Sequence, residues 1–468
     1  MKLNILTVAY NAEKTIKRSI ESVINQSSSN WKYYLVDNGS LDSTYSIMKE
    51  YENVENIIIK HIEQNDIKNA FKMINEIVKN ESSDDLLCTL DSDDELTDIF
   101  AETVLNEMQA QDIDLVALGT EMYSTSNGTL LKRFVIDNRL MIDDQNIANF
   151  FPNIHWFLRQ IWGKAFRLSV LRKYDIQHPD IPYGADTVFT MDYVANSSKY
   201  VFIPTIGMKY YYFDGSSSYI YKDGREISDL LLYQKALSTV SAKCDRLPYS
   251  TIDFMNNVYL HAIIDSLNVL INSDFNLAKK LQLTISIFKM FEENTISISQ
   301  NLSEEYNNLK KNTFHAYISL INEHPDLFNK DNCPEIQKFV LFYNSQLNFW
   351  FSDEFDWWLR NYAPLIEKIA FKEYQLLFNM LIKNKDAILL YPNATKQHLL
   401  MLLQKLAATL EREEDYIFFS LELIWTKIKL NDFAYAESEL AEWQSLLPNN
   451  KRVKELSLLL SNQQQLGK

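Results

Sequence analysis

The N-terminal part of the chain alternates short apolar runs with amphipathic stretches. Residues 4–9 form an apolar-rich run, and residues 13–26 carry isoleucines and a valine at the i, i+3, i+4 spacing of one helical face. The same alternation predicts strands at 31–36, 57–61 and 86–90 and helices at 43–51 and 67–78. Alternating strands and helices usually form a largely parallel sheet covered by helices, so the sequence predicts an α/β domain.

The pattern becomes mixed after residue 98 and helical after about residue 222. The mixed part predicts a helix to 109, a strand at 115–118, a turn at 126–128, a helix at 169–174, and strands at 199–203 and 208–212. Apolar residues then recur every three or four positions, as at 260–271 and 399–410. We therefore expect three domains: an α/β domain at 1–222 and helical domains at 223–330 and 331–468.

One segment of the helical half has a more specific pattern. Residues 431–450 resemble the second helix of a tetratricopeptide repeat and end in proline and asparagines, although Trp443 replaces the usual alanine. About three such repeats are needed for a stable stack, and no 34-residue period precedes this one. Repeat-like helical hairpins and an unrelated helical bundle are therefore equal alternatives.

Composition narrows the class of protein. Only 9 glycines and 10 prolines occur among 468 residues, which favours long helices over a turn-rich β protein. The formal charge of −16 disfavours nonspecific binding to nucleic acid or anionic lipid. No apolar run reaches the roughly 18 residues of a membrane span, so a cytoplasmic protein is expected. Cys88, Cys244 and Cys333 are too scattered for a disulfide framework or zinc site and are expected to be free thiols.

An acidic cluster follows the strand predicted at 86–90. Asp91, Asp93 and Asp94 crowd three carboxylates at a strand end, where open α/β sheets bind ligands. A hard divalent cation that carries a ligand phosphate would relieve their repulsion, whereas a solvated loop or a helix cap is the alternative. No glycine-rich phosphate loop occurs in the sequence, so a metal on Asp93 is the most available counter-charge for a diphosphate.

Three motifs in order carry a family resemblance. They are TVAYN at 7–11, VDNGSLDST at 36–44 and LDSDD at 90–94. Together they resemble a family 2 glycosyltransferase with the GT-A fold, a Rossmann-like mixed sheet, over roughly residues 1–220. Nothing comparable identifies the helical half.

The resemblance implies roles for several side chains. Tyr10 and Asp37 would contact the nucleobase of a UDP-sugar, Asp91 the ribose, and Asp93 a Mn²⁺ or Mg²⁺ ion on the diphosphate. A tyrosine ring and a carboxylate suit uracil, since one stacks and the other accepts the imide hydrogen. Asn38 stands where the family usually has a second aspartate, so a role that needs that charge is in question. A core ring and a turn residue are the alternatives for Tyr10 and Asp37.

The resemblance extends to a second group. Lys164, in WGKAFR at 162–167, would neutralise the donor phosphate, unless it is an exposed lysine without a role. Asp186 would be the general base of an inverting transfer, although it also suits a helix N-cap. His155 and Trp156 are candidates for lining the sugar or acceptor pocket.

The function expected from these residues is metal-dependent transfer of a sugar from UDP to a hydroxyl group on a protein or glycan. The helical half would dock the acceptor or assemble a homo-oligomer. A catalytically inactive domain on a helical scaffold protein is the alternative. Aromatic residues at 350–358 suit core packing or a partner-binding face.

Overall fold

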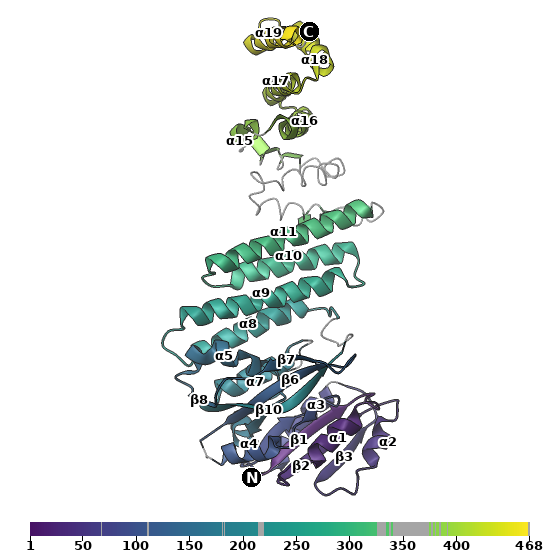
Figure 1. Ribbon diagram of the computed structural model, residues 1–468, viewed down its shortest axis with the longest axis vertical. Coiled ribbons are helices and arrows are strands. Elements are labelled where there is room, and N and C mark those ends of the chain that lie inside the picture. Colours follow the sequence, from purple (N-terminus) through teal and green to yellow (C-terminus); the bar gives the residue numbers. More distant parts are fainter. Residues whose placement is uncertain are drawn as a thin grey trace. The chain divides into compact units, whose positions relative to one another are not determined.

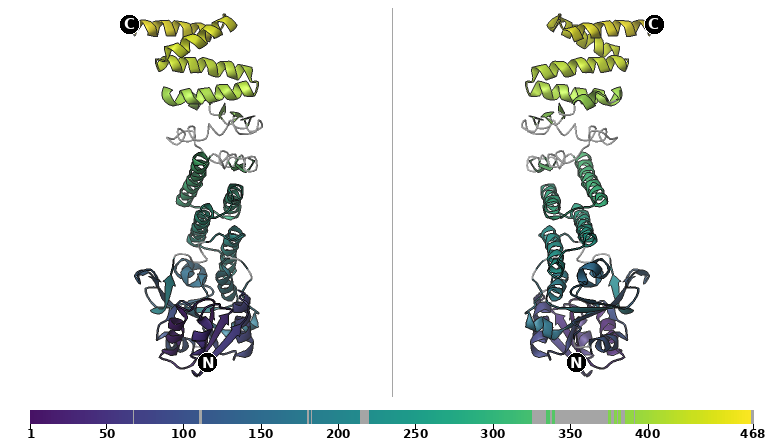
Figure 2. Two further views of the ribbon diagram at one scale, coloured as in Figure 1. Left: turned by 90° about the vertical axis from the view of Figure 1, so that its right-hand side faces the viewer. Right: turned by 90° about the vertical axis from the view of Figure 1, so that its left-hand side faces the viewer.

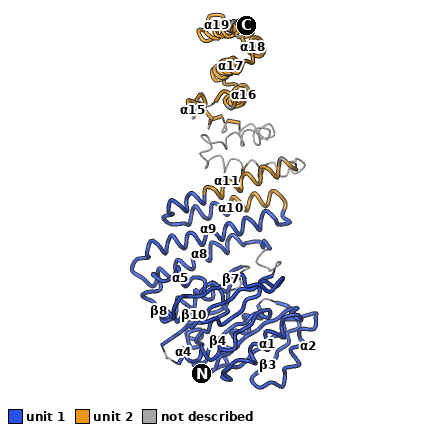
Figure 3. The backbone as a smooth tube through the Cα atoms, viewed as in Figure 1, with its two compact units in different colours: residues 1–275, 286–306 blue, residues 276–285, 307–468 orange. Residues whose placement is uncertain are grey.

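The computed structural model describes two compact units. Its described residues are 1–66, 68–109, 112–179, 181, 183–213, 220–324, 334–336, 338–339, 374–375, 378–379, 381–382, 385–390 and 392–466. Unit 1 comprises Met1–Phe275 and Ser286–Tyr306, and unit 2 comprises Asn276–Ile285 and Asn307–Lys468 (Figure 3). The expected combination of an N-terminal α/β fold and a helical C-terminal region is confirmed (Figure 1).

Unit 1 is built on a mixed sheet. The strands are β1 (Leu3–Ala9), β2 (Trp31–Asn38), β3 (Ile57–Ile62), β4 (Leu86–Thr89), β5 (Glu95–Leu96), β6 (Leu115–Ser124), β7 (Leu130–Phe134), β8 (Leu140–Asp143), β9 (Lys164–Arg167) and β10 (Lys199–Tyr212). Among the described residues, these ten strands follow the order β3-β2-β1-β4-β9-β6-β10-β5, and β7 and β8 pair with β6 and β10. Strands β3, β2, β1 and β4 run parallel, so their carboxyl ends share one edge.

Helices cover this sheet. They are α1 (Ile16–Ile24), α2 (Thr44–Lys49), α3 (Lys68–Asn80), α4 (Phe100–Met108), α5 (Ile147–Arg159), α6 (Leu168–Lys173) and α7 (Ala185–Ala195). The apolar stripe predicted for 13–26 is the buried face of α1, where Ile16, Ile20 and Val23 have no exposed surface. These side chains join one apolar core with residues of β1, β2 and β4.

Several parts of unit 1 differ from the sequence prediction, among them strand β8, which was not predicted. Strand β10 is continuous from 199 to 212, with register shifts between Ile203 and Met208, where two separate strands were expected. Helix α5, which contains Pro152, and strands β5 and β9 were not predicted. A strand can pass an irregularity when its neighbours continue the ladder, and here β6 pairs with β10 on both sides of the shift.

The helical part of unit 1 begins with α8 (Arg225–Ser241) and α9 (Tyr249–Ile271), which lie side by side in Figures 1 and 2. They follow residue 222 and group with the sheet in unit 1. Helices α10 (Leu277–Asn294) and α11 (Gln300–Glu323) come next, and each has residues in both units. The boundary expected at 222 stays a prediction, and the one expected at 330 lies outside the described residues.

Unit 2 contains successive helices that pack on one another. Its later elements are α15 (Lys385–Leu389), α16 (Asn393–Thr409), α17 (Glu413–Lys429), α18 (Phe433–Leu446) and α19 (Lys451–Leu466) (Figure 2). Trp443 of α18 is buried in a core with residues of α17 and α19, and the repeat-like interpretation of this segment stays a prediction. The aromatic residues at 350–358 and Cys333 lie outside the described residues, whereas Cys88 and Cys244 are free thiols.

In the part of the chain that the structure describes, none of the helices is both long enough and apolar enough to span a bilayer.

Candidate functional site

A pocket of about 550 Å³ lies at the carboxyl ends of the parallel strands. We call it the strand-end pocket. Residues of β1, β2 and β4 form one wall, and the end of α5 with the starts of α7 and α8 forms the other. Its polar lining comprises Asn38, Thr89, Asp91, Arg159, Gln160, His178, Tyr183, Asp186, Thr187, Lys222 and Arg225. This is where ligands bind in open α/β sheets.

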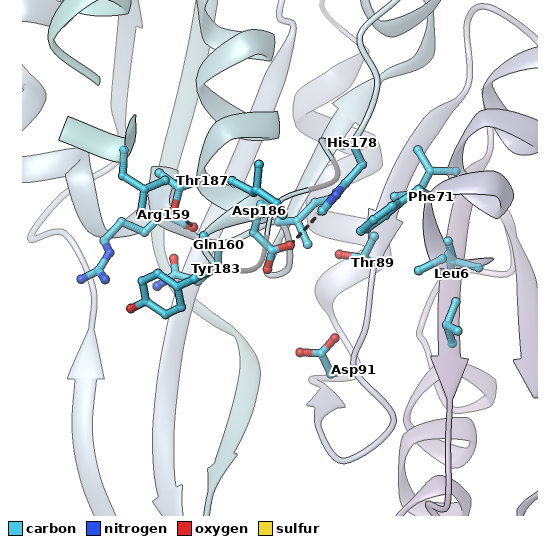
Figure 4. A pocket seen from close by; sticks show the side chains of 18 of the residues that line it. Leu6, Phe71, Thr89, Asp91, Arg159, Gln160, His178, Tyr183, Asp186 and Thr187 are labelled. Atoms are coloured by element: carbon cyan, nitrogen blue, oxygen red, sulfur yellow. Dashed lines mark hydrogen bonds and ion pairs between the residues drawn. The ribbon is translucent and has the colours of Figure 1, made fainter. Parts of the chain in front are cut away.

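Asp186 projects into the strand-end pocket from the first turn of α7. The helix follows Gly184, whose φ of +77° is a left-handed conformation that glycine adopts without strain. The side chain of Asp186 is 45% exposed, and its Oδ1 lies 3.1 Å from Nε2 of His178 (Figure 4). A carboxylate that is both open and oriented can accept a proton from a bound hydroxyl group.

His178 is itself held in place. Its side chain is 4% exposed, and its ring stacks on Phe71 at 3.9 Å and on Phe189 at 5.7 Å between centroids. Nδ1 lies 3.4 Å from the carbonyl oxygen of Pro179. With its ring fixed by these contacts, His178 restricts the orientation of the Asp186 carboxylate. The sequence analysis missed this residue.

Asp91 lies in the same pocket as Asp186, although 95 residues separate them in the sequence (Figure 4). Its carboxyl group faces the pocket, and the residue is exposed to solvent. Desolvation by the protein atoms around the carboxyl group, followed by the negative charges of Asp93 and Asp186, raises the pKa of Asp91 to about 7. The site therefore concentrates negative charge on carboxyl groups that come from distant parts of the sequence.

Asp93 and Asp94, the other carboxylates of the acidic cluster, also have raised pKa values. Asp94 is fully buried, and its Oδ1 accepts a hydrogen bond of 2.8 Å from the backbone N–H of Tyr211. Its Oδ2 has no hydrogen-bond partner among the described residues. Desolvation and the charges of Asp91 and Asp93 raise the pKa of Asp94 well above its usual range. Desolvation also raises the pKa of Asp93, and the nearby Arg18 opposes that shift.

The carboxylate oxygens of this cluster suit a hard divalent cation if a bound phosphorylated ligand supplies further oxygen atoms. Within the described ranges, no group of three or more His, Cys, Asp or Glu side chains converges to hold a metal by itself. Mg²⁺ and similar ions commonly bind through one or two carboxylates and complete their shell with water and substrate phosphate. The orphaned oxygen of Asp94 and the partly exposed Asp93 fit a cation that arrives with a phosphorylated ligand.

Tyr10 and Asp37 lie at neighbouring strand ends, because Ala9 pairs with Asp37 in the register of β1 and β2. The Tyr10 side chain is 43% exposed, as a base-stacking surface requires. Asp37 is buried, and its Oδ2 lies 2.7 Å from Nδ1 of His61. His61, for which the sequence carries no motif, therefore holds this carboxylate, and the expected contact of Asp37 with a nucleobase stays a prediction.

The hydrogen bonds of Asn38 need an amide, not the aspartate that the family usually has at this position. Its Nδ2 donates to Oδ1 of Asn65 at 3.0 Å and to the carbonyl of Asp66 at 3.1 Å. Its Oδ1 accepts from Nδ2 of Asn69 at 2.8 Å. A carboxylate cannot donate, so an aspartate here would lose the first two bonds.

Lys164 is buried rather than open to the strand-end pocket. It is 1% exposed, and its Nζ donates to the carbonyl oxygens of Gln160 at 2.6 Å and Trp162 at 2.7 Å. Desolvation lowers the pKa of Lys164 to about 7, while the charge of Asp186 opposes the shift. The negative charge of Asp186 is thus close enough to act on Lys164.

The side chains of His155 and Trp156 point in different directions, because consecutive residues of a helix such as α5 lie on different sides of its axis. His155 lines a second cavity, of about 270 Å³, between α5, α7, α8 and α9. We call it the helix cavity. Burial lowers the pKa of His155 to about 3, so the imidazole is neutral near pH 7. Trp156 instead stacks on Phe134 at 3.5 Å. The structure brings neither side chain together with Asp91 and Asp186.

Comparison with known proteins agrees with this geometry. The family model for "Glycosyl transferase family 2" matches residues 4–175. The "Putative glycosyltransferase EpsE" of Bacillus subtilis is 32% identical over 93 residues, which are 20% of this chain and 33% of that protein. The "Cholesterol galactosyltransferase" of Borreliella burgdorferi is 22% identical over 43% of this chain and 58% of its own length. Three of the curated relatives are matched over only a quarter to a third of their length.

The fold has a counterpart among solved structures. The structure of "S. aureus TarS 1-349 in complex with UDP-GlcNAc" has a TM-score of 0.50, with 16% identity, over 74% of this chain and 93% of that chain. At this identity the likeness concerns the fold, which agrees with the GT-A-type sheet expected from the motifs. Residues 4–175 therefore form a glycosyl transferase family 2 domain.

Proposed function

We propose that this protein transfers a sugar from a UDP-sugar to a hydroxyl group of an acceptor, with inversion at the anomeric carbon. The observation that carries the proposal is the meeting of Asp91 and Asp186 in one pocket at the carboxyl ends of the parallel strands. The UDP-GlcNAc bound to the TarS structure of the same fold supports a UDP-linked donor.

The reaction would be a single displacement. The acceptor oxygen forms a bond to the anomeric carbon while the bond from that carbon to the diphosphate oxygen breaks. Asp186 takes the proton of the acceptor hydroxyl, and His178 keeps the carboxylate oriented through its hydrogen bond. UDP leaves with the electron pair of the broken bond.

Asp93 is the residue proposed to hold Mn²⁺ or Mg²⁺ with the donor diphosphate. A bound divalent cation would offset the charge that develops on the departing diphosphate. Tyr10 and Asp37 are proposed to contact the base and Asp91 the ribose. The acceptor is proposed to be a protein or glycan, and acceptor docking and self-association stay predictions for the helical region.

The direct test is hydrolysis of a panel of UDP-sugars and GDP-sugars by the full chain in the presence of Mn²⁺. Without an acceptor, water can replace the hydroxyl nucleophile, so slow release of UDP should identify the donor. Hydrolysis of GDP-sugars alone would contradict the uridine assignment. Absence of both binding and hydrolysis across the panel would favour a domain that keeps the fold without the activity.

The proposed contact of Lys164 with phosphate has a pH signature. Lys164 gains positive charge as pH falls through about 7, and a bound phosphate would favour that charged form. If the contact exists, affinity for UDP should fall as pH rises from 7 to 9. The same titration of a Lys164→Met variant should show a smaller fall. Calorimetry at pH 7, 8 and 9 measures both.

Equal pH dependence in the two proteins would remove Lys164 from the donor site. Its role would then be the structural one given by its two carbonyl partners. Titrating only above pH 7 keeps the second ionisation of phosphate, near pH 6, out of the comparison.

A further inference from the structure

The helix cavity adjoins the strand-end pocket. Arg159, Tyr183, Thr187 and Leu232 line both spaces. Thr187 directly follows Asp186 in α7, so the helix cavity begins one residue away from the proposed base. The hydroxyl of Thr187 donates to the carbonyl oxygen of Arg159 at 2.6 Å, which fixes this shared wall. A ligand in the helix cavity would therefore lie next to the reacting centre.

The floor of the helix cavity is aromatic and buried. Tyr233 and Tyr259 stack with their ring centroids 4.8 Å apart, and Phe151 packs at right angles to Phe254 beside them. All three lining rings are at most 6% exposed. Flat aromatic surfaces of this kind pack against the C–H faces of sugar rings.

The rim of the helix cavity is polar and charged. Arg159, His261 and Asp265 are exposed and line the opening. In the part of the chain described by the structure, neither Arg159 nor Asp265 forms an ion pair, so both retain hydrogen-bonding capacity for a ligand. An aromatic floor below such a rim matches a ligand with an apolar face and several hydroxyl groups.

The inner wall contains a buried polar network. Asp229 accepts a hydrogen bond from Ser266, which in turn accepts one of 2.9 Å from Nε of Arg225. The Arg225 guanidinium lies 4.6 Å from the ring centroid of Tyr183. Tyr183 lines both spaces and Arg225 lines the strand-end pocket, so this network connects the lining of the helix cavity to that of the strand-end pocket.

We propose that the helix cavity binds one polyhydroxylated unit of the acceptor, a sugar ring or a sugar alcohol, beside the hydroxyl group that is glycosylated. This inference rests on the proposed function. The volume of about 270 Å³ is slightly below the roughly 300 Å³ at which ligand pockets usually begin, so one small unit fits and an extended chain does not. Helices α8 and α9, which supply much of the lining, lie beyond the residues matched by the family model.

The test measures binding of small probes to the full chain in the presence of saturating UDP and Mg²⁺, a diamagnetic ion that leaves the NMR signals of the probes sharp. Saturation-transfer NMR would compare methyl β-glucoside, methyl N-acetyl-β-glucosaminide and sorbitol with cyclohexylmethanol, which has a similar ring but only one hydroxyl group. At least one of the three polyhydroxylated probes should bind saturably and more tightly than cyclohexylmethanol.

Substitutions then locate the site. Ala262→Phe places a ring in the helix cavity and should weaken binding at least tenfold. Ile264→Phe changes a partly buried residue of the same helix that lines neither space and should have no effect. Asp265→Ala removes an exposed hydrogen-bond acceptor with little risk to folding and should weaken binding several-fold. Affinity for UDP should be the same in all four proteins.

Three results would overturn the proposal. The first is that none of the polyhydroxylated probes binds saturably. The second is that Ala262→Phe and Ile264→Phe bind these probes equally well. The third is that cyclohexylmethanol binds as tightly as the polyhydroxylated probes. Failure of the proposed function would look different, because UDP itself would then fail to bind to the unmodified chain, whether or not the probes occupy the helix cavity.

Discussion

Replacing Asp186 by asparagine should reduce the rate of sugar transfer by roughly 10²-fold or more, the size expected when a general base is lost. The amide keeps the shape of the side chain but cannot take the proton of the acceptor hydroxyl. Because Asp186 is 45% exposed and its folding contacts are few, the variant should fold normally and keep its affinity for the donor. Steady-state transfer rates and calorimetry with UDP measure the two effects separately.

Asp192→Asn is a matched control for this prediction. The residue belongs to the same helix, lines neither space, and forms an ion pair with Lys235. Asp192→Asn should keep the rate of sugar transfer within about twofold of that of the unmodified chain. A partly exposed ion pair contributes little to stability, so the fold should be retained. If Asp186→Asn weakened donor binding and left turnover unchanged, Asp186 would be a binding residue and the base would lie elsewhere.

The elements of the fold that the sequence predicted are those with a clear periodic signal. Helix α1 and strands β1, β2 and β4 were predicted because their apolar residues recur at helical spacing or in short runs between polar turns. Helix α5 was missed because Pro152 lies inside it and normally marks a helix boundary. Strand β10 was divided into two because its register shifts interrupt the pattern, whereas pairing with β6 keeps it continuous.

The candidate site was predictable only where short motifs carry it. Asp91 and Asp186 were identified by their neighbours in sequence, and the fold brings them into one pocket. His178 and His61 carry no such signal, since a lone histidine has no characteristic spacing and its partners come from other elements. The burial of Lys164 could not be predicted from the sequence either, because it depends on carbonyl groups that converge only in the folded chain.

Asp93→Ala should abolish the contribution of Mn²⁺ to UDP binding. In the unmodified chain, Mn²⁺ should strengthen UDP binding at least tenfold, because the cation would bridge the diphosphate to a cluster with unneutralised carboxylates. The variant should bind UDP with the same weak affinity whether or not Mn²⁺ is present. The proposed contacts to the base and ribose would remain, and no glycine-rich loop is present in the sequence to hold the phosphates instead.

Calorimetry of UDP with Mn²⁺, with Mg²⁺ and with a chelator measures this dependence in the unmodified chain, in Asp93→Ala and in Asp98→Ala. Asp98 is an exposed aspartate five residues further on, outside the acidic cluster at 91–94, so its substitution controls for a general loss of negative charge. Asp98→Ala should retain the full effect of Mn²⁺. Metal-independent affinity of equal strength in all three proteins would refute the metal assignment. The repulsion among Asp91, Asp93 and Asp94 would then have to be relieved by proton uptake, which the raised pKa values of Asp91 and Asp94 permit.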